Sequence, residues 1–397
     1  MKRLAVVAAA VWLATLTSSL TAQPQLDGQQ IFRYDTFGDE QLWTNTLRMH
    51  EAVAAVSPNT ALSVGLKVDV EALPADLIAA LKAQAVNLDD PAVTRALLSL
   101  NAVVGVIGRV SGTTVESIGV TCALCHSTVD NSFATGIGKR LDGWPNRDLD
   151  VGAIIALSPV VKADPAALAI YTSWGRGKYD PRWRAFTGTG FIQLNPPSFP
   201  VVLPPAYGLR QVPFETFTAD GPVSYWNSYV AVTQMGGHGS FHDPRIPLAV
   251  VQTPDLVTPK LPALRAYQLS LRAPSPPRGS FDVVAAQRGR HLFNGRAQCG
   301  TCHQEPAFTD VGRGSAFSRR PFLHAPSETG MEAVYASRSV TGLYRTTPLR
   351  GVWQRPPYFH DGSATDLPAV VDHYNTVLSL GLDAAEKLDL VEYLKSL

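Results

Sequence analysis

The chain has few cysteines and almost no surplus of charge. Its 397 residues contain four cysteines, and 34 Lys and Arg balance 33 Asp and Glu for a net charge of +1. This balance excludes nucleic acid and an anionic membrane surface as electrostatically attracted partners. Beyond the N-terminus, no apolar run is long enough to span a bilayer. A hydrophobic fraction of 45% still allows packed cores, and the length predicts two or three domains.

Residues 1–22 have the pattern of an export signal. Lys2 and Arg3 precede a short apolar stretch, and small residues follow up to Ala22. The stretch is short for a transmembrane helix, although an uncleaved anchor stays an alternative. We therefore expect a periplasmic protein.

All four cysteines fall in two copies of the pentapeptide Cys-x-x-Cys-His. The copies are Cys122 and Cys125 with His126, and Cys299 and Cys302 with His303. This is the attachment signature of c-type haem, in which the thiols form thioethers and the histidine ligates the iron. A zinc site would need about four ligands, and a redox dithiol has no use for the histidine. The sequence predicts two covalent haems c and leaves no cysteine for a disulfide.

The pattern of apolar residues predicts a mainly α protein with long loops. Helical spacing covers 74–82 and 91–106, and a helix capped by Ser280 leads into the second haem motif. Asp383 and Glu386 form a candidate capping box for a last helix. The predicted division is a helical N-terminal extension, a first haem c domain, a Pro-rich linker and a second cytochrome c domain, at 23–110, 111–272, 273–280 and 281–397. Each haem domain is expected to have a class I cytochrome c-like fold.

A short internal echo follows each haem motif. Residues 205–221 match 347–362 weakly, and each segment precedes a predicted helix. When the two segments are aligned at their Asp-Gly dipeptides, Ala219 precedes Asp-Gly in the first copy and His360 precedes it in the second. His360 is therefore the predicted sixth ligand of haem 2, with Tyr358 and Met331 as alternatives, and haem 1 would lack the matching ligand. An iron with two axial ligands suits electron transfer, and an open iron can bind a small oxidant.

The loop at 234–242 supplies the candidates for the distal side of haem 1. Met235 or His238 could ligate the iron, or Gln234, His238 and His242 could line an open pocket and handle protons. A surface loop without such a role stays an alternative. We assign His238 and Gln234 as candidate catalytic residues and Met235 as a candidate ligand. His50, His291, His324 and His373 are expected to be structural.

These motifs resemble the bacterial dihaem cytochrome c peroxidases and the related MauG-type enzymes. Besides the two haem motifs, the resemblance rests on Thr-Thr-Pro-Leu-Arg (346–350), Tyr-Phe-His-Asp-Gly-Ser (358–363) and the last helix. It is good over 281–397, fair over 115–240 and absent over 24–110. The resemblance implies electron entry at the haem held by His303 and His360, and a peroxide site at the haem held by His126.

Two features of that family find no clear match in the sequence. The peroxidases typically have a distal acidic residue, whereas the loop here offers Gln234, His238, His242 and Asp243. A calcium site cannot be recognised. Trp144, Trp226 and Trp353 are candidate electron relays or simply core aromatics.

Three functions follow from these observations. The first is a peroxidase-like oxidoreductase that takes electrons from a small donor, such as a monohaem cytochrome c or a cupredoxin, and passes them to hydrogen peroxide or another small oxidant. The second is a dihaem electron carrier with both irons six-coordinate, which the missing distal acid favours. The third is an oxygenase that acts on an organic substrate. The assembly state is open, with a homodimer among the options.

Overall fold

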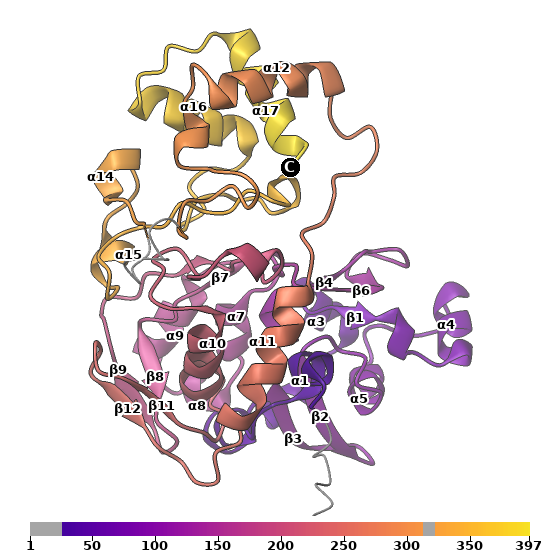
Figure 1. The fold of residues 1–397 in the computed structure, drawn as a ribbon. Coiled ribbons are helices and arrows are strands. Elements are labelled where there is room, and N and C mark those ends of the chain that lie inside the picture. Colours follow the sequence, from indigo (N-terminus) through magenta and orange to yellow (C-terminus); the bar gives the residue numbers. More distant parts are fainter. Residues whose placement is uncertain (1–25, 313–321) are drawn as a thin grey trace, which may run out of the picture.

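The computed structural model describes residues 26–312 and 322–397, and it contains two lobes joined by a coil (Figure 1). The first lobe comprises residues 26–272 and the second comprises residues 281–397. The segment 273–280 between them contains neither helix nor strand. The predicted export signal lies outside the described residues. Within the described ranges, no helix has both the length and the apolarity needed to cross a membrane.

Helices outweigh strands, as predicted. The first lobe contains eleven α-helices: α1 Gly28–Tyr34, α2 Met49–Val53, α3 Pro58–Ser63, α4 Ala75–Lys82, α5 Pro91–Ser99, α6 Ala123–His126, α7 Val151–Ile155, α8 Pro159–Lys162, α9 Pro165–Thr172, α10 Val223–Tyr229 and α11 Leu261–Ser270. Among its described residues, the second lobe contains α12 Val283–Asn294, α14 Pro326–Thr329, α15 Val334–Ser337, α16 Leu367–Val377 and α17 Ala384–Lys395.

The strands lie in the first lobe and form six two-stranded sheets in the described chain. One pair is parallel: β1 Val68–Asp69 with β5 Ile137–Gly138. The others are antiparallel: β2 Val106–Ser111 with β3 Thr114–Val120, β4 Ser127–Val129 with β6 Arg140–Asp142, β7 Lys178–Tyr179 with β10 Val201–Val202, β8 Arg184–Phe186 with β9 Phe191–Gln193, and β11 Phe241–Asp243 with β12 Leu248–Val250. These short sheets support loops rather than form a layer of the fold.

Most predicted helices are present, with two corrections. The helix over 74–82 is α4, whereas the helix predicted over 91–106 ends at Ser99 and the chain turns into the hairpin β2–β3. That hairpin delivers the chain to the first haem motif. Asp282, not Ser280, caps α12 by accepting from the amides of Val284 and Ala285. The capping box of Asp383 and Glu386 is confirmed at the start of α17.

The second lobe is built around a close crossing of α12 and α17. A Cβ at Gly289 in α12 would lie 2.0 Å from the carbonyl oxygen of Asp389 in α17, so only glycine allows this approach. One turn further along, the rings of Phe293 and Tyr393 meet edge to face at 5.1 Å. These are the two crossing helices that the sequence predicts for this part of the chain.

The first lobe repeats this crossing with α1 and α11. A Cβ at Gly28 would lie 2.1 Å from the carbonyl oxygen of Ala263, and the rings of Phe32 and Tyr267 lie 5.6 Å apart. In each of the four helices the aromatic ring lies four residues after the residue at the close approach, which is glycine in α1 and α12, alanine in α11 and aspartate in α17. The segment before residue 110, which the sequence analysis treats as an extension, therefore contributes α1 to the same helix pairing that organises the second lobe.

One apolar core unites that N-terminal segment with the first haem segment. It contains Phe32, Leu98, Leu124 and Leu264, so residues from both predicted divisions pack together. The second lobe has its own core around Phe293. Each Cys-x-x-Cys-His motif adjoins one of these cores, and the boundaries proposed from the sequence stay a prediction.

Candidate haem sites

The first haem motif lies on a single helical turn held by backbone bonds. Cys122 precedes α6, which ends at His126. The amide of Asn146 donates to the carbonyl of Cys125 at 2.9 Å, and the Nδ1 of His126 bonds the Pro204 carbonyl at 3.0 Å. Burial lowers the pKa of His126 to about 4, against the opposing effect of this hydrogen bond. The ring is therefore neutral, and Nε2 keeps the lone pair that an iron needs.

The second motif repeats this arrangement. Nδ1 of His303 bonds the Phe308 carbonyl at 3.1 Å. Burial lowers the pKa of His303, and the carbonyls of Phe308 and Thr347 oppose that shift. A backbone carbonyl bonded to Nδ1 fixes the tautomer and the ring orientation of a metal-ligating histidine. Both histidines thus fit the role of proximal ligand.

The thiols also fit attachment to a large apolar cofactor. None of the four cysteines forms a disulfide, and all are half-buried. Burial raises the pKa of Cys122 and Cys125 to about 12 and that of Cys299 to about 11, so the thiols are protonated and unsuited to redox exchange. This environment supports thioether attachment and argues against a dithiol redox site.

One cluster of side chains near the second motif could in principle hold a metal ion. Cys302, Asp310 and His324 offer ligand atoms within 4.8 Å of one another. The cluster includes neither His303 nor Cys299, so it is not the closed four-ligand site that structural zinc requires. His324 instead bonds Asp310 at 3.1 Å and Glu328 at 2.9 Å, in agreement with its expected structural role.

The internal repeat is present in the backbone, but its register differs from the one suggested by matching residue types in the two segments. Gly208 and Gly351 precede matching 3₁₀ turns with φ of 71° and 70°. Backbone bridges then join Glu215 to Gly221 and Tyr358 to Ala364. The glycine and the two bridge residues of the first lobe are each 143 residues before their counterparts in the second lobe, for example 351 − 208 = 143.

In this register the counterpart of His360 is Phe217, not Ala219. The adjacent residues Thr216 and Phe359 share a positive φ, 61° and 64°, which supports the match. Comparing His360 with Ala219 was therefore wrong by two positions, because the matching letters Asp-Gly fall at different points of the two loops.

His360 is buried among aromatic rings. Its Nε2 bonds the Tyr344 hydroxyl at 3.0 Å and lies 3.4 Å from a carboxylate oxygen of Glu332. The rings of Tyr335 and Phe199 stack on it at 5.8 and 6.2 Å. Ligation of an iron would require Nε2 to leave these partners, and the role of His360 as a ligand stays a prediction. Of the two alternatives, Tyr358 donates to the Val352 carbonyl at 2.9 Å, and Met331 packs in the same aromatic cluster as Tyr335.

A residue that the sequence analysis overlooked lies beside the second motif. The thiols of Cys299 and Cys302 are close enough to Tyr374 to raise the pKa of its phenol, although burial is the largest cause of that shift. Tyr374 lies on α16, and the offset of 143 pairs it with Ala231, which is fully buried after α10. Alanine therefore stands where the repeat places the phenol of the second lobe, and the phenol near the first motif, Tyr179, comes from a different element, β7. The sequence signal that could have identified Tyr374 is its position in a predicted helix C-terminal to the repeated segment.

Gln234 belongs to a cluster of hydrogen-bonded polar groups close to the first motif. Its side-chain oxygen accepts from the Tyr179 hydroxyl at 2.8 Å, and its amide donates to the Arg184 carbonyl at 3.0 Å. Burial raises the pKa of Tyr179 well above its ordinary value, and the nearby Cys125 adds to the shift. Tyr179 therefore links Gln234 to the haem 1 attachment site. Both line a cavity of about 30 Å³, together with Trp43 and Trp174.

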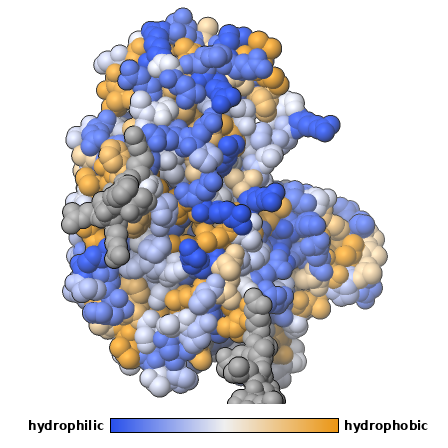
Figure 2. Space-filling model, viewed as in Figure 1, coloured by the Kyte–Doolittle hydropathy of each residue, from blue (hydrophilic) through white to orange (hydrophobic). Residues whose placement is uncertain are grey.

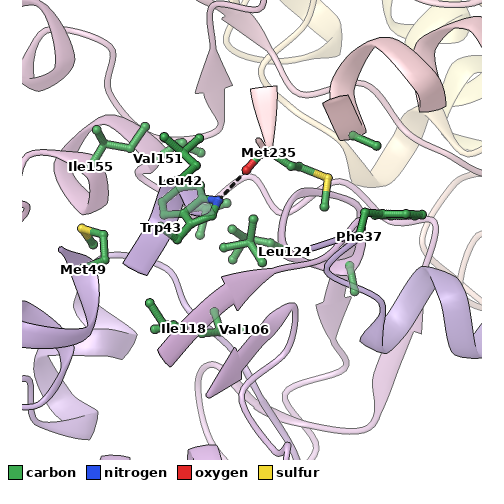
Figure 3. Close-up of a cluster of buried hydrophobic side chains, with 14 of the residues drawn as sticks. Phe37, Leu42, Trp43, Met49, Val106, Ile118, Leu124, Val151, Ile155 and Met235 are labelled. Carbon is green, nitrogen blue, oxygen red and sulfur yellow. Dashed lines mark hydrogen bonds between the residues drawn. The ribbon is translucent and has the colours of Figure 1, made fainter. Parts of the chain in front are cut away.

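The other predicted distal residues are not gathered at one point. Met235 is buried in the same core cluster as Leu124 of the first motif, and its carbonyl accepts from the Trp43 indole at 2.9 Å (Figure 3). His238 is half-buried and anchored through its backbone to Phe37 and Leu256. His242 is exposed on β11.

Asp243, the acidic residue of this loop, is already paired. It receives two charged donors from Arg245, including Nη2 at 2.8 Å, and the Tyr225 hydroxyl at 2.8 Å. Burial raises the pKa of Asp243, but these hydrogen bonds outweigh it and hold the pKa below its ordinary value. Asp243 stays ionised and fits a structural role.

An aromatic contact joins the two lobes. Trp144 lies two residues before Asn146, and Trp353 lies in the 3₁₀ turn of the second lobe. Their rings meet edge to face at 6.0 Å and 86°, and Tyr207 lies 6.5 Å from Trp144. Trp226 is instead packed within the first lobe against Tyr225 and Tyr229.

Comparison with known proteins supports the resemblance over part of the chain. The methylamine utilization protein MauG of Methylorubrum extorquens is 35% identical over 97 residues, which is 22% of this chain and 24% of MauG. The cytochrome-c peroxidase IdrP2 of Denitromonas iodatirespirans is 27% identical over 153 residues, 30% of this chain and 42% of that protein. The chain thus spans less than half the length of these curated relatives. No family model matches.

Two solved structures match the chain at low similarity. A MauG-like protein associated with microbial copper homeostasis has a TM-score of 0.35 at 17% identity and covers 55% of this chain and 86% of its own. Hydrazine synthase of Kuenenia stuttgartiensis has a TM-score of 0.32 at 20% identity and covers 55% and 84%. These scores are too low to support an argument. The sequence similarity, together with the paired haem motifs, supports the resemblance to MauG and the cytochrome-c peroxidases.

Proposed function

We propose that this chain is an exported dihaem c-type oxidoreductase. In this proposal, electrons enter at the haem of the second lobe, and peroxide is reduced, or a related oxidation is driven, at the haem of the first lobe. The observation that carries the proposal is the difference between Tyr374 beside the second motif and Ala231 at the equivalent position of the first lobe. A methyl group has no ligand atom, so Ala231 cannot close the first iron as Tyr374 is proposed to close the second.

The chain's own residues would hold the two haems in different states. His126 and His303 are the proximal ligands, oriented by the carbonyls of Pro204 and Phe308. We propose Tyr374 as the sixth ligand at the second site and keep His360 as the competing assignment. Bound haem iron supplies one-electron chemistry when six-coordinate and binds small oxidants when a coordination position is open.

Gln234 and Tyr179 are the proposed polar groups at the first site. Reduction of one hydrogen peroxide to two waters consumes two electrons and two protons. The electrons come from an external one-electron donor protein, such as a small cytochrome or a cupredoxin. The protons must come from solvent through groups within hydrogen-bond reach of the oxidant. Tyr179 donates to Gln234 and lies near Cys125, so it is our candidate hydroxyl for this task. His238 is the other candidate for this relay.

Trp144 and Trp353 are the proposed contact for electron passage between lobes. They bring the segment after the first motif against the segment after the second, with ring centroids 6.0 Å apart. Tyr207 extends the contact into the first lobe.

One observation favours an electron carrier instead. The amide of Gln234 already bonds protein groups, namely the hydroxyl of Thr233 and the carbonyl of Arg184, and Asp243 is paired with Arg245. If Met235 also ligates the first iron, both haems would be closed. Optical and EPR spectra of the oxidised and half-reduced holoprotein test the choice. A peroxide-sensitive high-spin signal supports the enzyme, and two peroxide-insensitive low-spin signals support the carrier.

A further inference from the structure

A pair of arginines without acidic partners lies where the two lobes meet. Arg147 follows Asn146, whose amide bonds Cys125, and Arg355 belongs to the second lobe. Arg355 is buried, with 6% of its surface exposed. Within the described ranges, Nε and Nη1 of Arg147 and Nε of Arg355 are buried and have no hydrogen-bond partner.

The two guanidinium groups lie close enough to interact. Burial lowers the pKa of Arg147 to about 9, and the next largest cause is the positive charge of Arg355. Neither arginine forms an ion pair with any described carboxylate, although the other buried arginines of the lobe junction do: Arg182 pairs with Asp220, and Arg345 with Glu215. A buried and a half-buried positive charge side by side without an anion are destabilising, so this part of the fold lacks a negatively charged component.

Two tyrosines complete the walls of this site. Tyr207 and Tyr358 both interact with the charges of Arg147 and Arg355. Their hydroxyl protons are already used, since Tyr207 donates to the Gly351 carbonyl and Tyr358 to the Val352 carbonyl. Nη2 of Arg355 donates to the Pro348 carbonyl, so the free donors of the site are Nε and Nη1 of Arg147 and Nε of Arg355, which suit a carboxylate or a phosphate.

We propose that Arg147 and Arg355 bind a propionate carboxylate of the haem attached to Cys122 and Cys125, and so clamp the second lobe onto the first haem. This inference rests on the proposed dihaem function. The first haem is chosen because the site is built on the chain around its motif: Asn146 bonds Cys125, and Pro204, which bonds His126, lies three residues before Tyr207. The junction has hydrophilic residues gathered on its visible face, so a soluble anion is the competing occupant (Figure 2).

The holoprotein variants R147Q and R355Q test the clamp. Resonance Raman spectra report the propionate bending modes, and spectroelectrochemistry reports the midpoint potential of each haem. We expect both variants to shift the propionate modes of one haem only and to lower its potential, because losing a nearby positive charge favours the ferric state. R109Q removes the same charge from an exposed arginine and should change neither readout. R147K and R355K keep the charge but lose the planar fork, so they should restore the potential more fully than the propionate modes.

Three results would overturn the proposal. The first is unchanged propionate modes and potentials in R147Q, R355Q and both lysine variants. The second is a shift confined to the haem attached at Cys299 and Cys302, identified in a C299S/C302S variant. The third is titration of inorganic phosphate into the wild-type holoprotein that shows binding lost in R147Q, since the arginines would then face a soluble anion. The proposed dihaem function fails separately, if the wild-type protein carries fewer than two covalent haems by the pyridine haemochrome assay.

Discussion

The offset of 143 residues that relates the two repeated halves pairs Ala231 with Tyr374, and of these two only Tyr374 carries a side chain that can ligate iron. Tyr374 lies beside the thiols of the second haem motif. The halves therefore share a backbone plan and differ at the position that we propose decides whether an iron is open. This difference, rather than the comparison of His360 with Ala219, supports a division of labour between the two haems.

Replacing Tyr374 tests which residue closes the second iron. Y374F removes the ligand oxygen and keeps the ring, so we expect one low-spin ferric signal to become high-spin in EPR while the other haem is unchanged. H360Q should leave that signal low-spin, because Nε2 of His360 bonds Tyr344. The reverse pattern would assign the ligand to His360. Y358F is a matched control, since the Tyr358 hydroxyl is bonded to the Val352 carbonyl.

The polar group at the first site is expected to govern the peroxide reaction. Q234L should slow the second-order reaction with hydrogen peroxide, because it removes the acceptor of the Tyr179 hydroxyl. The expected loss lies within the roughly 10²–10⁴-fold range of positioned proton-transfer groups. Stopped-flow spectroscopy measures it. H242A changes an exposed histidine of the same segment and should react like the wild type, whereas an equal loss in H238A alone would move the proton relay to His238.

The contact between lobes should carry electrons. W353F keeps an aromatic ring but removes the indole that meets Trp144 at 6.0 Å, so electron transfer from the second haem to the first should slow after flash reduction. W226F is the control, because Trp226 packs within the first lobe. Equal rates in wild type and W353F would show that the haems exchange electrons by another route.

The close crossing of α12 and α17 leaves no room for a side chain at Gly289. A Cβ there would meet the Asp389 carbonyl oxygen at 2.0 Å, which the backbone cannot avoid without moving α12 away from α17. G289A should therefore lower the free energy of unfolding by about 1–3 kcal/mol, the usual cost of overpacking. Urea denaturation measures the change. Alanine at Gly190, where nothing lies within 4 Å, should be nearly neutral.

Low pH should reduce the stability that Asp243 and its hydrogen bonds contribute to the fold. Its hydrogen bonds, chiefly to Arg245, hold the folded-state pKa below the ordinary value of 3.8, against the effect of burial. A depressed carboxyl pKa stabilises the fold above the unfolded pKa, and this contribution is lost as the pH falls through the folded value. The stability difference between wild type and R245Q should thus be constant near neutral pH and shrink below about pH 4. A difference independent of pH down to acid unfolding would contradict this pairing.

The sequence predicts features that are contiguous and misses those that depend on distant contacts. The two Cys-x-x-Cys-His motifs and the crossing of α12 and α17 could be predicted, because motif, apolar stripe and cap lie within one short segment. The matching pair in the first lobe was missed, because 90 residues separate Phe32 from Cys122 and α1 is only seven residues long. The shared Gly-x-x-Ile/Leu-Phe pattern of Gly28 and Gly289 was the available signal.

The register of the internal repeat could not be predicted from the residue types alone. The positive φ angles at Gly208 and Gly351 and the two backbone bridges define it, and a letter match at Asp-Gly conflicts with them. Tyr374 was overlooked for the same reason, since its nearness to Cys299 depends on how α16 packs over the second motif.

Low-temperature EPR of the oxidised and half-reduced holoprotein, with and without hydrogen peroxide, tests the central claim most directly. The account predicts one low-spin signal that Y374F converts to high-spin, and one high-spin signal that peroxide alone abolishes. Two low-spin signals in both redox states, unchanged by peroxide, would contradict it and identify the chain as an electron carrier.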